Sequence, residues 1–531
     1  MKHRLVNSVY IGCASKARTK RTATRPRRDE VRPTARNISR FLLASGQVVD
    51  NKDANMLIMQ WGQFIAHDLA KTTLLPFQRC DSCRRGTDHC VNAPTDLGDG
   101  RFGRAGCLRI VRSSPVCGTG RNDHKREQLN ENTAFLDGSA VYGSSLRDAN
   151  RLRESPQSGF LRMQRFRRSG FFPPFNDRGC RGSQRNCNVM FQAGDNRANM
   201  FVGLAATHTV FAREHNRIVQ EFRRINRHWS ADRLYHEARK IVGAQIQHIT
   251  YHEYLPKLFG HAMAGFIPPY TGYKPDVDPR VANEFVAATF RLGHGMIQES
   301  YPRLDADGNS IRQGALRFRD STFQTKKLLF EGGVDPILRG MQSQAIKMPQ
   351  RLSPAITEGL FGTTDLASIN IQRGRDHGIP NYMRWREFCN LTHAHRTNDL
   401  NANILDEIVL ERLKNAFEDE PRNIDLYVGC MLEDPIANAL IGPTLSCLVA
   451  EQFTRLRDGD RFWYENADIF TPAQRSELRK STFSKLLCDN GDGYKQAPTN
   501  SFDIARPENT KPCNRIEGVD LEQWREPQDS E

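Results

Sequence analysis

The 531-residue sequence predicts a mainly helical fold with very little β-structure, organised as one large domain. Three observations favour this class: long segments carry apolar residues at helical spacing, segments with the alternating pattern of strands are few, and no low-complexity linker divides the chain. Only 38% of the residues are hydrophobic. No apolar run approaches the roughly 20 residues of a spanning helix, so no membrane span is expected.

Six segments are expected to form most of the helical body. Residues 51–70 carry apolar side chains on more than one face, which indicates a deeply buried helix. Residues 201–222 place His208 and His215 on one apolar face, about 10 Å apart, which is too far for a shared metal and is typical of hydrogen-bonded core histidines. The other expected helices are 231–255, 281–298, 403–416 and 436–457.

Thirteen cysteines, several of them clustered, suggest disulfide-stapled surface loops and an oxidising, secretory compartment. Zinc is the alternative at Cys80 and Cys83, because His89 and Cys90 follow at ligand-like spacing. The Gly-, Asp- and Arg-rich segment 84–106 shows no periodicity, which favours a stapled loop over a metal site.

The net charge of +15 suggests anionic partners such as an acidic polysaccharide. Much of this charge lies in residues 1–31, which we expect to form a basic, disordered tail. Nucleic acid is not expected as a partner, because no aromatic residue lies among the basic ones between Lys16 and Arg32. Glycosylation sequons at Asn37 and Asn390 fit a secreted glycoprotein, although no signal peptide is evident and the N-terminus is expected to be incomplete.

Two motifs carry polar side chains in arrangements that could serve catalysis or the binding of a metal ion. In residues 60–68, Gln-Trp-Gly-Gln-Phe-Ile-Ala-His-Asp, Gln63 and His67 lie four apart on one face of an apolar helix, and Asp68 follows directly. A hydrogen-bonded core would satisfy such buried groups equally well. Residues 133–139, Thr-Ala-Phe-Leu-Asp-Gly-Ser, carry oxygen-bearing side chains at alternate positions, so that loop oxygens can converge on a hard cation such as calcium.

Three further motifs are ambiguous when taken singly. Residues 193–199, Ala-Gly-Asp-Asn-Arg-Ala-Asn, deliver Arg197 near the start of a long helix. Residues 290–295, Phe-Arg-Leu-Gly-His-Gly, flank His294 with glycines that would let a flat group approach the backbone. Residues 369–378, Ile-Asn-Ile-Gln-Arg-Gly-Arg-Asp-His-Gly, form a dense polar string. In this order and combination the five motifs resemble the animal haem peroxidases. Residues 112–118, Arg-Ser-Ser-Pro-Val-Cys-Gly, look most similar to the peroxidasin and chorion-peroxidase branches.

The resemblance implies an animal haem-peroxidase domain over residues 32–514, followed by a short tail over 515–531. Such a domain uses hydrogen peroxide to oxidise phenolic or tyrosyl groups, or small anions such as halide and thiocyanate, through a ferryl intermediate. The setting implied is extracellular matrix, eggshell or cuticle cross-linking, or defence, with matrix proteins as partners. A non-catalytic matrix or adhesion protein on the same fold, like peroxinectin, is the alternative.

The resemblance also assigns roles to single residues. His67 would be the distal acid–base group, Arg197 would stabilise charge on the departing oxygen, and Gln63 would bind distal water or halide. His294 would be the proximal iron ligand, with Asn370 accepting the proton on its Nδ1. The propionate partners would be Arg291 and Arg373, and the calcium ligands would be Asp68, Thr133, the Phe135 carbonyl, Asp137 and Ser139.

This sequence departs from the family at the two positions that many members use to attach haem through esters. It has Ala66 and Met200 where those members have Asp and Glu. Neither side chain can form an ester, so we expect a haem b that is not ester-linked. A less distorted haem has less oxidising power for halides, and one-electron oxidation of phenols is then the favoured reaction.

By the family pattern, ten of the cysteines form five disulfides and three remain. The expected pairs are Cys80–Cys90, Cys83–Cys107, Cys180–Cys187, Cys389–Cys447 and Cys488–Cys513. Of the others, Cys430 lies in a buried-looking stretch, Cys13 lies in the basic tail, and Cys117 is available to link two chains into a dimer.

Overall fold

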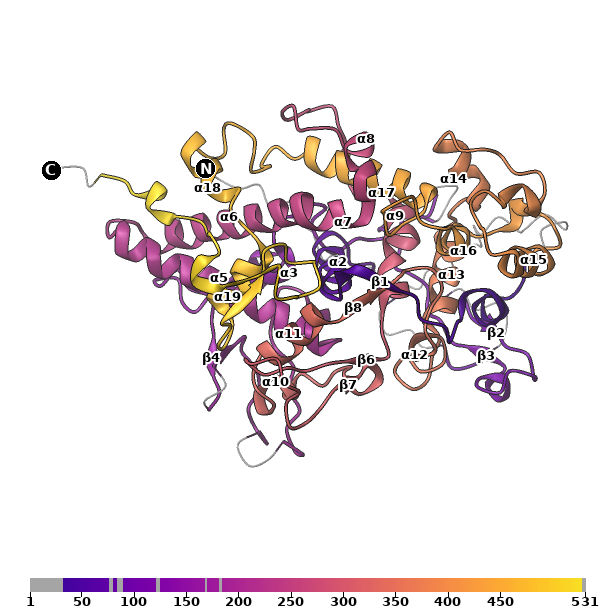
Figure 1. Ribbon diagram of the computed structural model, residues 1–531, viewed down its shortest axis with the longest axis horizontal. Helices are drawn as coiled ribbons and strands as arrows, with labels where there is room; N and C mark the ends of the chain where they lie inside the picture. The colour runs from indigo at the N-terminus through magenta and orange to yellow at the C-terminus, as the bar shows by residue number, and fades with distance from the viewer. Residues whose placement is uncertain are drawn as a thin grey trace.

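The computed structural model describes residues 32–75, 80–83, 89–120, 125–167, 170–180 and 184–527. It confirms the mainly helical class, with one body of packed helices and, over these ranges, strands only in five short antiparallel pairs (Figure 1). No helix in this part of the chain is both long and apolar enough to cross a membrane. The predicted basic tail and Cys13 lie outside the described residues.

The elements have the following bounds. The α-helices are α1 (Ala35–Ile38), α2 (Leu57–Leu69), α3 (Ser139–Tyr142), α4 (Leu146–Leu152), α5 (Val202–Ile225), α6 (Ala231–Ile249), α7 (Leu255–Phe259), α8 (Met263–Phe266), α9 (Asn283–Ala287), α10 (Lys326–Phe330), α11 (Asp335–Ser343), α12 (Pro354–Thr357), α13 (Leu366–Asp376), α14 (Tyr382–Phe388), α15 (Glu407–Ala416), α16 (Leu426–Leu432), α17 (Pro443–Asp458), α18 (Pro472–Leu478) and α19 (Phe483–Asn490). The π-helical segments are η1 (Ser39–Leu43) and η4 (Thr250–Tyr254).

The 3₁₀-helices are η2 (Gly103–Ala105), η3 (Asn196–Asn199), η5 (Gly260–Ala262), η6 (Thr289–Met296), η7 (Phe318–Asp320), η8 (Thr397–Leu400), η9 (Pro421–Asn423), η10 (Cys513–Arg515) and η11 (Leu521–Trp524). The strands are β1 (Asp50–Asn55), β2 (Ala93–Pro94), β3 (Cys107–Leu108), β4 (Gln164–Arg165), β5 (Phe171–Phe172), β6 (Ser300–Tyr301), β7 (Leu316–Arg317), β8 (Ala345–Lys347), β9 (Gln496–Pro498) and β10 (Thr510–Pro512). They pair as β1–β8, β2–β3, β4–β5, β6–β7 and β9–β10.

Helix α2 lies at the centre of the molecule, with α5 and α6 on one side and α13 to α16 on the other (Figure 1). The predicted helix over 51–70 begins too early, because β1 occupies its first residues and pairs with β8, almost 300 residues away in sequence. The chain then turns at Asn55, whose Oδ1 accepts a hydrogen bond from the Leu57 N–H. Burial around nearly the whole circumference of α2 confirms the prediction of a deeply buried helix.

Two other predicted helices are each divided into two segments. The segment 281–298 is not one helix but α9 followed by the 3₁₀-helix η6. A Cβ at Gly295 would lie 1.8 Å from the Pro349 carbonyl oxygen, so the backbone there must approach its neighbour closely. The segment 231–255 passes from α6 into the π-helix η4. Helices α15 and α17 begin four and seven residues later than predicted.

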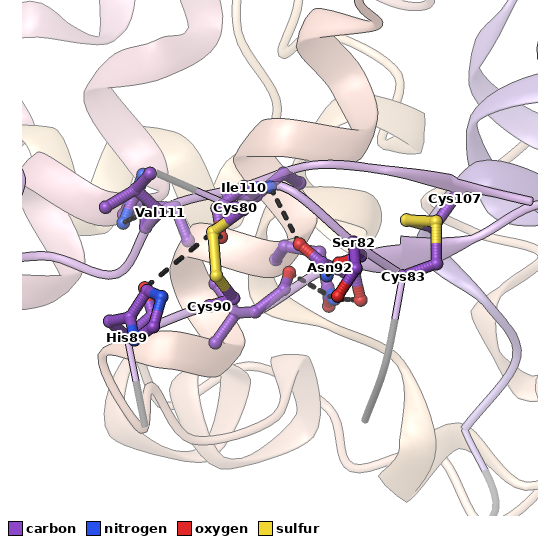
Figure 2. Close-up of a disulfide and its surroundings, with 12 residues drawn as sticks. Cys80, Ser82, Cys83, His89, Cys90, Asn92, Cys107, Ile110 and Val111 are labelled. Atoms are coloured by element: carbon purple, nitrogen blue, oxygen red, sulfur yellow. Dashed lines mark hydrogen bonds between the residues drawn. A yellow bond between two sulfur atoms is a disulfide. The ribbon is translucent and has the colours of Figure 1, made fainter. Parts of the chain in front are cut away.

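All five predicted disulfides are confirmed. Cys80 bonds Cys90, and Cys83 bonds Cys107 (Figure 2), so none of these sulfurs is available to a metal and the zinc alternative is excluded. Cys430 is buried and unpaired. Cys117 is itself disulfide-bonded, so it offers no free thiol for the predicted dimer link.

The stapled loop braces the helix that carries Asn370 and Arg373. The Gln372 side chain on α13 donates to the carbonyls of Val91 and Asn92, and Arg373 donates to the Val111 carbonyl. Val91 and Asn92 directly follow Cys90, and Cys90 forms an antiparallel β-bridge with Val111. The disulfides therefore hold one wall of the site.

The last described segment packs onto the body of the domain. Leu521 and Trp524 on η11 are buried, and the Trp524 carbonyl accepts a hydrogen bond from Asn226 at the end of α5. Of the residues predicted as a C-terminal tail, those up to 527 thus cover one end of the long helices α5 and α6.

Candidate active site

Four residues form a stripe of partial exposure along α2. They are Gly62, Gln63, Ala66 and His67, at helical positions i, i+1, i+4 and i+5, while the other residues of the helix are buried. This stripe is the face on which the sequence predicted Gln63 and His67 to lie together. Helix α2 packs against η6, which carries His294. The stripe is thus the part of α2 that its packing neighbours leave partly accessible.

His67 is held at the end of α2 with its ring polar atoms available. Its carbonyl accepts hydrogen bonds from Asn132 and from Arg197, whereas its Nδ1 is buried with no partner among the described residues. Burial, together with the neighbouring Arg197 charge, lowers the pKa of His67 well below its usual value. The ring is therefore neutral at physiological pH.

Arg197 is held by the carboxylate of Asp195, a residue for which no role is predicted from the sequence. Its Nε donates to both oxygens of Asp195, at 2.9 and 3.2 Å, and its Nη2 donates to Asp195 Oδ2 at 2.5 Å and to the Ala70 carbonyl at 2.9 Å. Asp195 is fully buried, and the Arg197 guanidinium holds its pKa well below the usual range. Only Nη1 of Arg197 has no partner among the described residues, so that group is free to face a ligand.

The proximal motif forms a hydrogen-bonded row. Nδ1 of His294 lies 2.8 Å from the Asn370 amide nitrogen, and the Asn370 oxygen accepts a hydrogen bond from Arg291. This orientation is the reverse of the predicted one, in which the oxygen would accept the Nδ1 proton. The reason is that Arg291 has no carboxylate partner here and takes the amide oxygen instead. Nε2 of His294 has no hydrogen-bond partner among the described residues.

Two arginines near His294, Arg291 half-buried and Arg373 buried, favour an anionic ligand. Burial, and the like charge of Arg373, lower the pKa of Arg291 to about 10. Arg291 donates to the Val286 carbonyl and to Asn370 but meets no acidic side chain in the described part of the chain. Arg373 is paired with Asp376 and Ser113. A buried unpaired cation is costly, and a ligand carboxylate would offset the cost at Arg291.

Room for a flat group exists beside His294 on one side only. A Cβ at Gly293 would meet nothing within 4 Å, and the same is true of Gly374 on α13. Gly295, on the other side of His294, is packed against Pro349. The neutral His294 ring, the unpaired Arg291 and the open backbone at Gly293 together fit an iron porphyrin that carries propionates.

The predicted calcium loop folds around Asp68. Its Oδ1 accepts hydrogen bonds from the Ala140 N–H and the Ser139 hydroxyl, and its Oδ2 accepts from the N–H groups of Asp137 and Gly138. Thr133 donates to Asp137 Oδ1 and contacts the Ser139 hydroxyl at 3.2 Å. Four of the five predicted ligands therefore meet, and the Phe135 carbonyl makes no hydrogen bond within this group.

The loop and the Arg197 segment are directly joined. The Asp195 N–H donates to the Ala140 carbonyl, and the Gly194 N–H donates to the Val141 carbonyl. A Cβ at Gly194 would lie 2.3 Å from the Ser139 carbonyl oxygen, so only glycine permits this contact. Asp68, His67 and Arg197 are thus held by one continuous backbone network.

The family of the chain follows from a comparison with family models. The model described as animal haem peroxidase matches residues 3–502. The chain belongs to the animal haem peroxidases. It is 47% identical over 499 residues to "Peroxidase mlt-7" of Caenorhabditis elegans, a match that covers 94% of this chain and 68% of that protein. A peroxidase function, and with it a requirement for haem, hydrogen peroxide and a reductant, goes with membership of this family.

This animal haem peroxidase is also similar to two further proteins, and it spans very different shares of their lengths. "Peroxidasin homolog" of Homo sapiens is 38% identical over 527 residues, a match that covers 93% of this chain but 35% of that protein. Among solved structures, peroxidase A from Dictyostelium discoideum superposes with a TM-score of 0.75 at 28% identity, over 89% of this chain and 91% of that one. The chain thus spans about a third of human peroxidasin and most of the solved peroxidase domain.

An exposed aromatic pair, Phe323 and Phe361, lies beside the segments that lead to Arg197 and Asn370, and no pattern in the sequence predicts it. The rings of Phe323 and Phe361 are 46% and 42% exposed, and their centroids lie 5.4 Å apart. Both residues have positive φ, 55° and 51°, a strained conformation for a bulky side chain that is often kept at functional sites. The Phe323 N–H donates to the Met200 carbonyl, next to the Arg197 segment.

Phe361 reaches the pair from the proximal side, in the loop that leads into α13. Arg101 holds that loop by donating to the carbonyls of Glu358 and Gly362.

The prediction that His208 is a hydrogen-bonded core histidine is wrong for its hydrogen bonds. It is buried as expected, but both of its ring nitrogens lack a partner among the described residues, whereas His215 is bonded to Tyr142 and to the Gly159 carbonyl.

Proposed function

We propose that this chain is a secreted haem peroxidase that uses hydrogen peroxide for one-electron oxidation of phenolic and tyrosyl substrates. The observation that carries the proposal is the packing of α2 against η6. The first helix carries His67, whose carbonyl binds Arg197, and the second carries His294 and Arg291, which Asn370 on α13 joins in one hydrogen-bonded row. The five disulfides support an oxidising compartment. Of the two sequons, Asn390 is exposed, whereas the Asn37 side-chain oxygen is buried.

The residues around the site divide the reaction between them. Haem, when bound, supplies the iron at which peroxide is cleaved. His67 would take a proton from the near oxygen of hydrogen peroxide and deliver it to the far oxygen, which departs as water. Nη1 of Arg197 would donate to that departing oxygen and stabilise its charge. Gln63 lies one helical turn before His67 and would hold water beside it.

The proximal residues would hold the cofactor. Nε2 of His294 is free to ligate iron, and Arg291 would pair with a propionate in place of Asn370. Once Arg291 is withdrawn, the Asn370 amide can turn its oxygen toward the Nδ1 proton of His294. A neutral acceptor at that position leaves the ring less electron-rich than a carboxylate would.

Arg291→Met is expected to change apoprotein stability and haem binding in opposite directions. It removes a half-buried cation that has no carboxylate partner in the described part of the chain, so the haem-free protein should gain about 1 kcal/mol in unfolding free energy. It also removes a propionate partner, so haem should dissociate faster. Denaturant unfolding of apoprotein and haem transfer to apomyoglobin measure the two effects. Loss of stability in the apoprotein would contradict the assignment.

A calcium ion is proposed at Asp68, Thr133, Asp137 and Ser139, with the Phe135 carbonyl completing the set. Hard oxygen ligands from a short loop and from the residue after His67 suit this ion. Binding there would tie α2 to the loop, and through Asp195 to Arg197 as well.

The Phe323 and Phe361 pair is proposed to dock the phenolic ring of the substrate. Replacing either by alanine removes the ring and leaves a non-glycine residue at positive φ, so backbone strain is unchanged. An aromatic contact contributes about 0.5–1.5 kcal/mol, so KM for tyrosine should rise roughly threefold to tenfold with little change for iodide. Phe171→Ala, an equally exposed ring elsewhere, is the matched control. Equal effects on both donors would refute the assignment.

Haem is expected to be free of ester links, because Ala66 and Met200 offer no carboxylate. Acid–butanone extraction followed by mass spectrometry should recover unmodified haem b. Ala66→Asp is the informative variant, since it restores one carboxylate on the exposed stripe of α2 and should retain part of the haem on the peptide after peroxide treatment. Haem that stays attached to wild-type peptide would refute the prediction.

The proposed function is tested by reconstituting the oxidatively folded chain with haem and calcium. We expect a Soret band and peroxide-dependent guaiacol oxidation, with both lost in His294→Ala. A Soret band without guaiacol oxidation, or no haem binding at all, would instead support the non-catalytic matrix or adhesion protein.

A further inference from the structure

A row of contacting aromatic rings runs from η6 to the far side of η4. Phe290, one turn before His294, lies 5.5 Å from Phe453 between ring centroids, and Phe453 lies 5.8 Å from Tyr251. Tyr251 on η4 contacts Trp463 at 4.7 Å, and Trp463 contacts Tyr464 at 5.3 Å. The last three residues can each be oxidised by one electron, and together they lead away from the proximal helix.

Packed rings are the ordinary content of a core, so the row alone carries no function. What distinguishes its outer end is that the protons of Trp463 and Tyr464 have acceptors. The indole N–H of Trp463 donates to Glu465 Oε2 at 3.1 Å, and the Tyr464 hydroxyl lies 2.8 Å from His248 Nδ1. By contrast, the hydroxyl of Tyr494 is buried with no partner among the described residues.

His248 is placed to accept the phenolic proton. Burial lowers the pKa of His248 to about 3, so the ring is neutral and one of its two nitrogens is a proton acceptor. Nδ1 lies 2.8 Å from the Tyr464 hydroxyl, within reach of its proton. The ring of His252 stacks on His248 with centroids 4.3 Å apart, and its Nε2 lies 3.3 Å from the same hydroxyl.

The outer end of the row reaches the surface. His252 is exposed, although Trp463 and Tyr464 are each 1% exposed. The π-helix η4, which carries Tyr251 and His252, directly follows α6, which carries His248. The two histidines therefore lie four residues apart in sequence and stack on each other. A phenolic electron donor bound at the surface would then be separated from the Tyr464 ring by the side chain of His252.

We propose that Tyr464, linked through Trp463 and Tyr251 to the proximal helix, is a second oxidation site for phenolic donors too large to enter the haem pocket. The inference rests on the proposed peroxidase function, which supplies the oxidant. It assigns a site for tyrosyl groups on polymers or proteins, while small phenols react at the haem pocket itself.

In the first redox step, Tyr464 gives one electron, by way of Trp463 and Tyr251, to the peroxide-oxidised cofactor, and its hydroxyl proton passes to His248 Nδ1. The bound donor phenol then gives one electron to the Tyr464 radical and releases its own proton to water. His248 returns the first proton, which restores the Tyr464 hydroxyl. Two donor phenols are oxidised for each hydrogen peroxide reduced to water.

The first test needs no substitution in the row. The haem-loaded protein is mixed with hydrogen peroxide and the spin trap 2-methyl-2-nitrosopropane, and adducts are mapped by peptide mass spectrometry. We expect an adduct on Tyr464. In Trp463→Phe, which keeps an aromatic ring but cannot be oxidised as readily, the Tyr464 adduct should be lost although Tyr464 is intact. Tyr494→Phe is the control and should retain the adduct.

The second test compares one phenol at two sizes. Free tyramine and tyramine coupled to high-molecular-weight dextran are oxidised in parallel by wild type, Tyr464→Phe and Tyr494→Phe. We expect the ratio of dextran-bound to free tyramine oxidation to fall in Tyr464→Phe and to stay at the wild-type value in Tyr494→Phe. The Soret band and the melting temperature of each variant report whether it is folded and loaded.

The outcomes separate the two proposals. Oxidation of free tyramine without a Tyr464 adduct, or an unchanged size ratio in Tyr464→Phe, would overturn the second oxidation site and leave the peroxidase intact. No Soret band and no oxidation of free tyramine in the wild type would overturn the proposed function, and the second site with it.

Discussion

His67→Ala is expected to slow the reaction of the haem-loaded protein with hydrogen peroxide by about 10²–10⁴-fold, the usual contribution of a positioned acid–base group. The Soret band should persist, because His294 and Arg291 lie on the opposite helix. The physical reason is geometric. His67 is the side chain on the partly exposed stripe of α2 that can both take and return a proton. Stopped-flow absorbance at the Soret maximum measures the rate.

Rescue distinguishes proton transfer from a structural effect of the substitution. Added imidazole should restore part of the peroxide reaction in His67→Ala, because the free base can occupy the vacated space. It should not restore Arg197→Ala, since imidazole cannot replace a guanidinium held by Asp195. A peroxide reaction in His67→Ala that is as fast as in the wild type would refute the distal assignment.

Asp68→Ala is expected to lower the unfolding free energy by about 3 kcal/mol or more. The carboxylate accepts three backbone N–H groups and one hydroxyl, and each buried donor left unsatisfied costs about 1–3 kcal/mol. The loop from 137 to 140 should loosen, and with it the end of α2. Denaturant unfolding in the presence of EDTA isolates this loss from the contribution of calcium.

Asp137→Asn is the matched variant, because an amide oxygen can keep the hydrogen bonds from Thr133 and the Ser139 N–H. In EDTA it should be at least as stable as wild type, since it relieves repulsion with Asp68, whose pKa is raised by burial and by the neighbouring Asp137 carboxylate. In calcium it should lose most of the stabilisation that the wild type gains from the ion. Stabilisation of wild type and Asp137→Asn by calcium to the same extent would argue against an ion at this loop.

The parts of the site that the sequence predicts are those encoded locally. The four-residue spacing of Gln63 and His67 is enough to place them on one face of α2, and the alternation from Thr133 to Ser139 is enough to bring their oxygens together. Disulfide pairing followed from the family pattern, and the structure confirms it.

The parts that could not be predicted depend on contacts between distant segments. Nothing near residues 51–55 indicates a strand, because β1 forms by pairing with β8 and with the segment at Asp503, both distant in sequence. The break between α9 and η6 falls at Ala288, which leaves the helical conformation although its local sequence suits a helix. The Phe323 and Phe361 pair requires two loops to adopt positive φ, and the role of Asp195 appears only once Arg197 is seen to bind it.

The bracing of α13 by the stapled loop has a consequence for the order of biosynthesis. The loop from 80 to 117 is made early, but the helix it supports is made more than 250 residues later. Until then, the carbonyls of Val91, Asn92 and Val111 lack the donors that α13 supplies, and such unpaired nascent surfaces are prone to aggregate. Early oxidation of Cys80, Cys83, Cys90 and Cys107 would preform the receiving surface. Yield of the active protein should therefore depend more on the redox state during translation than on that during later refolding.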